Sequence, residues 1–497
     1  MEADAARYRA LVARDPRFDG VFFVGVQTTG IYCRPICPAR TPARARCAFF
    51  ATPVEAEAAG FRACFRCRPE LAPGSSPPEV GTGADRRSRA ASVDAIDALV
   101  HAATARIAEG GLNERSLDDL AGELGVTARH VRRALAARLG VSPVELAQSR
   151  RVALAKQLLH DTSLPLAQVA FASGFASVRR FNAAFSARMG CAPSTLRAHR
   201  RTREAPIELR LDYREPYDWP CLLAFLRGRA IPGVELVGDD DYRRIVHVDG
   251  VTGEIAVRPV RGRPALALAL APQLLPVLMP LVARVRRMFD LDAHPDAIAR
   301  ALRADRALGP LVAARPGLRL PGAIDPFEAS IRALLGQQVS VAAAKTLAGR
   351  FAARFGERVG QGELALRFPT PAEVAAAGAD RIVKVGLPAA RARAIHGFAA
   401  AVASRAVRLD GPLSAHELDA FVARLVELPG IGPWTAHYLA MRALHVPDAF
   451  PAADLGVQKA LRRSGARAAE ARAEAWRPFR SYAVMHLWTQ LSERTTR

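Results

Sequence analysis

The sequence predicts a multidomain protein that is mainly α-helical, with one α+β part. At 497 residues the chain is too long for a single hydrophobic core of ordinary size. Five of the seven cysteines lie in the first 67 residues, which sets a small Cys-rich module apart. Stretches rich in Pro, Gly and Ser, or in Arg, interrupt the hydrophobic pattern. We therefore expect a linker at 72–91 and modules at 1–71, 92–203, 206–318 and 319–497.

The composition favours a nucleic-acid partner. The net charge is +22, almost all from arginine, because lysine occurs only at positions 156, 345, 384 and 459. Genome base composition alone can produce an Ala/Arg-rich chain, but a charge of this size still attracts polyanions. Prolines interrupt the longest apolar stretch, ALALALAPQLLPVLMPLVA, and the first residues lack the apolar core of a signal peptide. We expect no membrane partner and a cytoplasmic, nucleoid-associated location.

The first module carries a metal-ligand pattern. Cys33 and Cys37 form one pair, and Cys64 and Cys67 form a second pair further along the chain. Four thiolates suit tetrahedral zinc, and a module of this size needs such a staple to fold. The odd cysteine total and the absence of a secretion signal disfavour a disulfide framework. We therefore expect one Zn²⁺ in a small domain with four cysteine ligands, and Cys47 as a packed residue.

The segments RDPRFDG, TTGIYCRPICPAR and EAEAAGFRACFRC resemble the N-terminal domain of Ada-type regulators of the response to DNA alkylation. The resemblance implies that all four cysteines hold zinc and that Cys33 accepts a methyl group from a DNA methylphosphotriester. Zinc keeps a thiol deprotonated, and methylation of one sulfur removes one negative charge that repels DNA. Nearby arginines are suited to grip phosphates, so we expect Arg34 to contact DNA. A purely structural zinc and a reversible metal sensor remain as alternatives.

The second module repeats a helix-turn-helix pattern. In SLDDLAGELGVTARHVRR, Ser116 and Asp119 form a capping box, Gly125 ends the first helix and Thr127 caps the second. LPLAQVAFASGFASVRRFNAAFSARMGCAP repeats this order from Leu164. The pair resembles the DNA-binding domain of AraC-type transcription activators, which implies promoter DNA and RNA polymerase as partners. Plain helical packing is the alternative. The expected DNA contacts are Arg129, His130, Arg133, Ser177, Arg179, Arg180 and Asn182.

The third module has a strand pattern. Short alternating runs such as IELRLDY, RRIVHVDG, GEIAVRPV and PALALAL predict antiparallel strands, which give the α+β part of the chain. From about residue 325 the pattern is helical again. Within it, LVELPGIGPWTAHYLAMRAL places Gly430 and Gly432 between two apolar helices. This is a helix-hairpin-helix, which binds the DNA backbone through N–H groups without reading the sequence.

Asp454 lies twenty residues after Trp434, in FPAADLGVQKAL. Together with YDWPCLLAF and DPFEASIRALLGQQVS, this resembles the helix-hairpin-helix base-excision glycosylases, and most closely 3-methyladenine DNA glycosylase II. The resemblance implies that Asp454 is the catalytic carboxylate, which stabilises positive charge on the sugar while an alkylated purine leaves. It also implies a base pocket formed by Trp434, Tyr438, Trp488, Phe225 and Gln337.

The sequence indicates a subclass within this resemblance. Relatives that also cut the strand carry a lysine two residues after the last hairpin glycine, and this chain has Trp434 there. We therefore expect a monofunctional glycosylase without lyase activity. The C-terminal residues lack the cysteines that would hold an iron–sulfur cluster, so no such cluster is expected. A transcription regulator whose glycosylase half is inactive is the alternative function.

Overall fold

The structure is a computed structural model that describes residues 2–74, 90–197, 207–409, 413, 415–462 and 465–496. Residues 75–89 of the expected linker lie outside the described residues. The chain divides into two compact units. The first comprises Met1–Glu215, Val260–Ala283 and Leu291–Ala293, and the second comprises Pro216–Pro259, Arg284–Asp290 and His294–Arg497. Each is described separately below.

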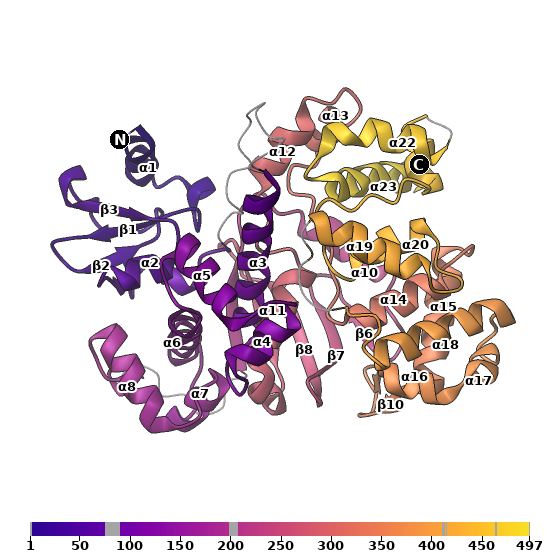
Figure 1. Ribbon diagram of the computed structural model, residues 1–497, viewed down its shortest axis with the longest axis horizontal. Helices are drawn as coiled ribbons and strands as arrows, with labels where there is room; N and C mark the ends of the chain where they lie inside the picture. The colour runs from indigo at the N-terminus through magenta and orange to yellow at the C-terminus, as the bar shows by residue number, and fades with distance from the viewer. Residues whose placement is uncertain are drawn as a thin grey trace. The chain divides into compact units, whose positions relative to one another are not determined.

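The Cys-rich module of the first unit is a small sheet with short helices around it (Figure 1). Strand β1 (Phe23–Val26) pairs antiparallel with β2 (Ile31–Cys33) and β3 (Cys47–Phe50). Strand β4 (Arg62–Ala63) pairs parallel with β2 and completes the order β3-β1-β2-β4. Helices α1 (Glu2–Ala13) and α2 (Pro53–Ala58) accompany it. The two cysteine pairs follow the ends of β2 and β4, which lie side by side.

The helical module of the same unit contains both predicted helix-turn-helix pairs. The first pair is α4 (Leu117–Glu123) and α5 (Ala128–Leu139), and the second is α7 (Leu166–Ala172) and α8 (Val178–Met189). Helix α6 (Pro143–Asp161) joins them, while α3 (Ala90–Ala108) and α9 (Pro193–Arg197) complete the module. The predicted capping box of Ser116 and Asp119 is present. Thr127 caps α5 as expected.

Strand β5 (Ile207–Asp212) and strand β9 (Ala265–Leu270) also belong to the first unit and pair antiparallel from Ile207↔Leu270 to Asp212↔Ala265. The longest apolar stretch continues from β9 into a 3-10 helix (Pro272–Val277) and helix α11 (Leu278–Met288). Among the described residues, no helix is both long enough and apolar enough to cross a membrane.

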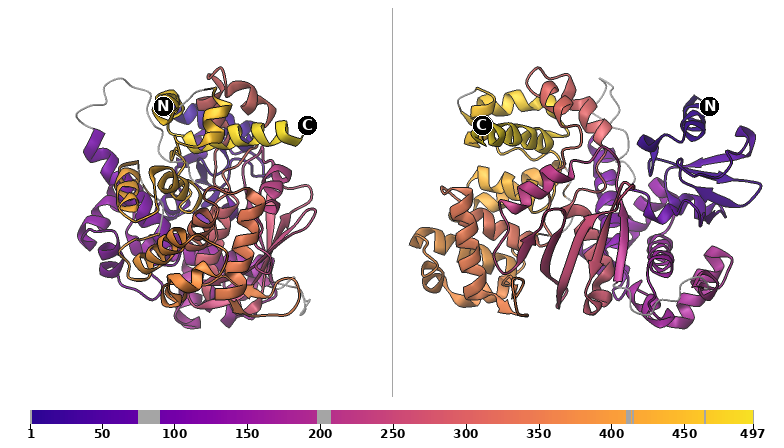
Figure 2. Two further views of the ribbon diagram at one scale, coloured as in Figure 1. Left: turned by 90° about the vertical axis from the view of Figure 1, so that its right-hand side faces the viewer. Right: turned by 180° about the vertical axis from the view of Figure 1, so that it is seen from behind.

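The second unit contains a run of antiparallel strands and many helices, most of which lie in the orange and yellow part of the chain (Figure 2). Strands β6 (Glu235–Val237), β7 (Tyr242–Val248) and β8 (Val251–Pro259) pair in that order. A small ladder joins β10 (Glu357–Arg358) and β11 (Leu366–Arg367). Trp476 is fully buried in the core. The helices are α10 (Trp219–Arg227), α12 (Pro295–Arg303), α13 (Gly309–Ala314), α14 (Pro326–Leu335), α15 (Val341–Phe355), α16 (Pro371–Ala377), α17 (Ala379–Val383), α18 (Ala389–Ala403), α19 (Ala415–Val426), α20 (Pro433–Arg442), α21 (Leu455–Ala460), α22 (Ala466–Ala473) and α23 (Arg480–Thr496).

Candidate functional sites

The four predicted ligands form one cluster in the first unit. The sulfur atoms of Cys33, Cys37, Cys64 and Cys67 all lie within 4.8 Å of one another, and all four residues are buried. Backbone N–H groups of Arg34 and Arg66 donate to the sulfurs of Cys67 and Cys64, each at 3.3 Å. Four converging sulfurs with donors around them fit the tetrahedral thiolate site that zinc prefers. These cysteines would hold the ion.

Cys47 is outside this cluster, as expected. It begins β3 and is buried, and its thiol donates to the Ala43 carbonyl at 3.4 Å. Burial raises the pKa of the Cys47 thiol, which keeps it protonated and unreactive. Its role in the structure is packing.

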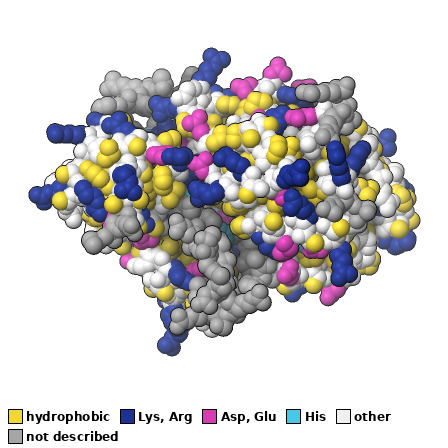
Figure 3. Space-filling model, turned by 90° about the horizontal axis from the view of Figure 1, so that it is seen from above, with side chains coloured by type: hydrophobic (Ala, Val, Ile, Leu, Met, Phe, Trp, Pro, Cys, Tyr) yellow, Lys and Arg dark blue, Asp and Glu magenta, His cyan; other side chains and the backbone are white. Residues whose placement is uncertain are grey.

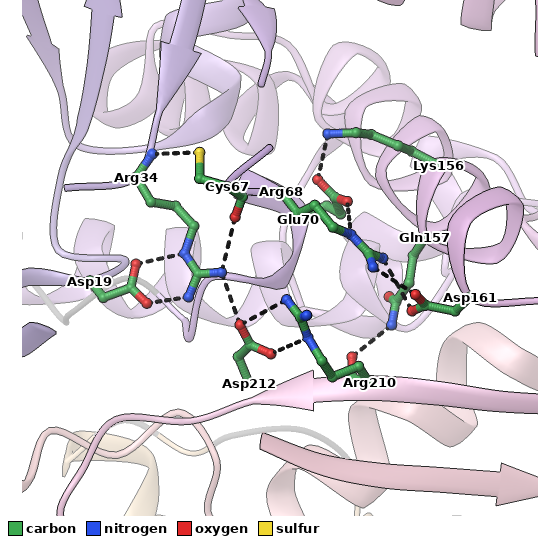
Figure 4. Close-up of polar contacts among 10 residues, drawn as sticks. All are labelled: Asp19, Arg34, Cys67, Arg68, Glu70, Lys156, Gln157, Asp161, Arg210 and Asp212. Carbon is green, nitrogen blue, oxygen red and sulfur yellow. Dashed lines mark hydrogen bonds and ion pairs between the residues drawn. The ribbon is translucent and has the colours of Figure 1, made fainter. Parts of the chain in front are cut away.

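Arg34 requires a correction. The sequence suggested a surface arginine that grips DNA, whereas its side chain is only 4% exposed. Its Nε donates to Asp19 at 2.8 Å and its NH1 donates to Asp212 at 2.9 Å (Figure 4). Burial works to lower the pKa of Arg34, but the two carboxylates raise it above its usual range. The guanidinium is therefore occupied inside the protein and not available to phosphate in this arrangement.

The candidate DNA contacts of the helical module lie on α5 and α8. Their charged or amide side chains are exposed, while hydrophobic residues of the same helices, such as Val131 and Phe181, are fully buried. Ser177 is the N-cap of α8, where its hydroxyl accepts from the Arg180 N–H at 3.2 Å. The exposed candidates are Arg129, His130, Arg133, Arg179, Arg180 and Asn182.

In the second unit, three donors fix the carboxylate of Asp454. The indole N–H of Trp434 donates to Oδ2 at 3.0 Å, and that of Trp488 donates to Oδ1 at 2.9 Å. The Val457 N–H also donates to Oδ1, at 2.8 Å, because Asp454 is the N-cap of α21. Helices α20, α21 and α23 therefore each contribute to holding one half-buried carboxylate.

Aromatic rings adjoin this carboxylate. The Tyr438 ring stacks on Trp434 at a centroid distance of 5.3 Å and lies 6.1 Å from Trp488. Tyr438 also lines a pocket together with Phe225, which comes from α10. The structure thus brings four of the predicted pocket residues to one region. Gln337 lies at the hairpin, where its Nε2 donates to the Gly430 carbonyl at 3.0 Å and the Thr435 hydroxyl at 3.1 Å.

Two arginines at this pocket were not anticipated. The guanidinium groups of Arg229 and Arg442 lie 3.8 Å and 4.7 Å from the centre of the Phe225 ring. Among the described residues, Arg442 Nε and NH1 are buried without a hydrogen-bond partner. Burial lowers the pKa of Arg442 to about 10, so the group stays cationic at neutral pH. The sequence held a signal, because each arginine lies four residues after an aromatic pocket residue: Arg442 follows Tyr438 on α20, and Arg229 follows Phe225 just beyond the end of α10.

The hairpin glycines differ in what they require. Gly430 has φ +82°, and a Cβ there would lie 2.5 Å from the Ala394 side chain of α18. Only glycine meets both conditions without strain. Gly432 has φ −90° and is the N-cap of α20, with open space where a side chain would be. Its openness leaves the helix N-terminus accessible, as phosphate binding would need.

Four protein-family profiles match the sequence. Residues 6–70 match the metal binding domain of Ada, and residues 120–199 match a helix-turn-helix domain. Residues 208–325 match the AlkA N-terminal domain, and residues 331–480 match the HhH-GPD superfamily of base excision DNA repair proteins. The predicted resemblances and the multidomain fold class are therefore confirmed. The bounds of the domains stay predictions.

Individual relatives agree with this order of domains. The chain is 38% identical over 280 residues to DNA-3-methyladenine glycosylase 2 of Escherichia coli, covering 56% of this chain and 95% of that one. It is 52% identical over 69 residues to the E. coli bifunctional transcriptional activator/DNA repair enzyme Ada, covering 14% of this chain and 20% of that one. A probable bifunctional transcriptional activator/DNA repair enzyme AlkA of Mycobacterium tuberculosis is 39% identical over 499 residues, 97% of this chain and 96% of that one. The chain belongs to this family of AlkA-type bifunctional transcriptional activator/DNA repair enzymes.

Proposed function

We propose that the second unit is a DNA-3-methyladenine glycosylase II that hydrolyses the N-glycosidic bond of alkylated purines. The observation that carries the proposal is the Asp454 carboxylate, held by the indole N–H groups of Trp434 and Trp488 beside the Tyr438 ring. As the bond from sugar to base breaks, the base leaves with the bonding electrons and the sugar gains positive charge. A fixed carboxylate stabilises that charge while water adds to the sugar carbon.

The aromatic rings beside Asp454 support the choice of substrate. Purines alkylated at N3 or N7 are cationic, and electron-rich ring faces attract such bases. The target must first be flipped out of the duplex, which exposes it to Trp434, Tyr438, Trp488 and Phe225. Trp434 occupies the place of the lysine that would attack the sugar as an amine in bifunctional relatives. We therefore propose a monofunctional glycosylase, which removes the base but does not cut the DNA strand.

The first unit supports a proposal for a DNA-alkylation sensor. Cys33 would attack the methyl carbon of a methylphosphotriester, so that a carbon–sulfur bond forms while the carbon–oxygen bond breaks. The phosphate oxygen keeps the electron pair and leaves as a phosphodiester anion. Bound zinc would keep the sulfur in its nucleophilic thiolate form. Arg34 is not offered as a phosphate ligand, because its side chain is buried against two carboxylates.

Double-stranded DNA is the proposed partner of both units. Lys and Arg side chains are spread over the face seen in Figure 3, which fits the net charge of +22. The exposed cations and amides of α5 and α8 would enter DNA grooves at promoter sites, with RNA polymerase as a further partner. The hairpin at Gly430 and Gly432 would hold the damaged strand by its backbone. We also propose that the protein is located in the cytoplasm, in association with the nucleoid.

Two measurements test the two activities separately. The full chain with zinc should release 7-methylguanine from alkylated duplex DNA, and no release would favour a regulator with an inactive glycosylase half. Mass spectrometry after incubation with methylphosphotriester DNA should show a gain of about 14 Da, one CH₂ group, on the Cys33 peptide. The same gain on the Cys64 peptide, or none, would favour a structural zinc or a metal sensor.

A further inference from the structure

Two buried groups of charged side chains join the cysteine loops to the rest of the first unit (Figure 4). The Arg34 cluster consists of Asp19, Arg34, Arg210 and Asp212. The Lys156 cluster consists of Arg68, Glu70, Lys156 and Asp161. The first connects the Cys33 loop with strand β5, and the second connects the loop of Cys64 and Cys67 with helix α6. The glycosylase and methyl-acceptor proposals use neither cluster.

The Arg34 cluster is centred on the residue after Cys33. The backbone N–H of Arg34 donates to the Cys67 sulfur at 3.3 Å, and its NH1 donates to the Cys67 carbonyl at 3.3 Å. The same NH1 donates to Asp212 of β5 at 2.9 Å, and Arg210 Nε donates to Asp212 at 2.8 Å. Asp19 takes the other side of the guanidinium. One side chain therefore contacts both a cysteine ligand and a strand 178 residues away.

The Lys156 cluster repeats this arrangement at the second cysteine pair. Lys156 of α6 is 1% exposed, and its Nζ donates to the Cys64 carbonyl and to Glu70, each at 2.8 Å. The ammonium also lies 5.2 Å from the centre of the Phe65 ring. Arg68, the residue after Cys67, donates to Asp161 at the end of α6 at 2.6 Å. Each cysteine loop is therefore tied by a buried cation to a neighbouring element.

The two clusters are themselves connected. Gln157 follows Lys156 on α6, and its Nε2 donates to the Arg210 carbonyl of β5 at 2.8 Å. A buried cation that loses its acceptors is strongly destabilising, so such a network tolerates little displacement of any partner. The acceptors include the Cys64 and Cys67 carbonyls, whose positions depend on the folding of the cysteine loops around a metal. The order of the loops and the order of α6 and β5 therefore depend on each other.

We propose that Lys156 and Arg34 are positioning residues that couple the state of the cysteine cluster to helix α6 and strand β5. Helix α6 connects the two helix-turn-helix pairs. A change in the metal or the cysteines of the cluster would therefore affect both pairs through packing contacts, in addition to any effect of the charge of the cluster on nearby DNA. Loss of the metal disorders the acceptor carbonyls and loosens α6 and β5. By thermodynamic reciprocity, weakening the Lys156 contacts loosens the hold on the metal.

Hydrogen–deuterium exchange on the full zinc-loaded chain tests the coupling directly. Removal of zinc with a chelator should raise amide exchange in peptides from Pro143–Asp161 and Ile207–Asp212 as well as in the cysteine loops. Peptides from Pro433–Arg442 in the second unit serve as the internal reference and should not change. Faster exchange confined to residues 6–70 would overturn the proposal. This experiment uses the wild-type protein and does not depend on measuring an enzymatic activity.

A matched pair of lysine variants tests whether Lys156 helps to hold the metal. Lys156→Met keeps the length and apolar stem of the side chain but removes its three donors. Lys384→Met makes the same change at an exposed lysine of the second unit. Competition with a chelating dye should show zinc held about 5- to 50-fold more weakly in Lys156→Met, within the usual range for coupled sites. It should be unchanged in Lys384→Met. Wild-type affinity in Lys156→Met would overturn the role of Lys156.

Discussion

Replacing Trp434 or Trp488 by Phe removes one N–H donor from Asp454 and keeps an aromatic ring in place. The two donors lie 3.0 and 2.9 Å from the carboxylate oxygens. A hydrogen bond to an ionised group contributes about 1.5–3 kcal/mol. Because about 1.4 kcal/mol corresponds to a tenfold change in rate, each variant should excise 7-methylguanine about 10- to 150-fold more slowly in single-turnover assays. The Val457 N–H still anchors the carboxylate, so some activity should remain.

Trp476 provides the matched control. Its indole N–H donates to Asp305 Oδ2 at 2.8 Å, and it is fully buried in the core. Trp476→Phe removes the same kind of hydrogen bond away from Asp454, so it should lower stability without slowing excision per folded molecule. The positioning role of the indoles is refuted if Trp434→Phe and Trp488→Phe both excise within about threefold of wild type.

Three further predictions concern the second unit. Burial lowers the pKa of His486 to about 4, so the folded state favours the neutral ring. The free energy of unfolding is therefore highest above about pH 6.5 and falls by about 3 kcal/mol towards pH 4, as the ring is protonated. Chemical denaturation should show a flatter pH dependence of stability in His486→Gln. Gly430→Ala would place an alanine at φ +82° with its Cβ 2.5 Å from the Ala394 side chain. It should lower the free energy of unfolding by about 1–3 kcal/mol and weaken binding to abasic DNA. Gly432→Ala should change stability little, because the space around Gly432 is open. Arg442→Met removes a buried cation beside Phe225. Two charges about 7 Å apart repel by about 2 kcal/mol at an effective dielectric of about 20, so excision of cationic 7-methylguanine should rise about 30-fold relative to neutral hypoxanthine. An unchanged ratio in a competition assay would show that Arg442 does not act on charge.

Local patterns in the sequence were sufficient to predict the features whose interacting residues lie close together along the chain. The Ser116–Asp119 capping box joins residues three positions apart, and it is present as predicted. The spacing within each cysteine pair is typical of metal ligands, and the four sulfurs converge. Asp454 as an N-cap also follows from local rules, because its carboxylate accepts from Val457 within the same turn.

Residues with distant partners could not be assigned in this way. Arg34 looked like a phosphate ligand because it lies between two metal ligands, but Asp212 binds it from 178 residues away. Lys156 lies on a helix, and lysine side chains are usually solvated, but its acceptor carbonyl lies 92 residues away. Periodicity reports which face of an element is buried but not which charge will be opposite. Such pairs are known only once the modules are packed.

The glycosylase account is tested most directly by excision of 7-methylguanine by Asp454→Asn. Asn is as good an N-cap as Asp, so α21 and the overall stability should be kept. The loss of the negative charge should slow single-turnover excision by a factor of about 100 to 1,000 or more, while binding to abasic DNA stays close to wild type. Excision at the wild-type rate by a folded Asp454→Asn protein would contradict the assignment of this carboxylate.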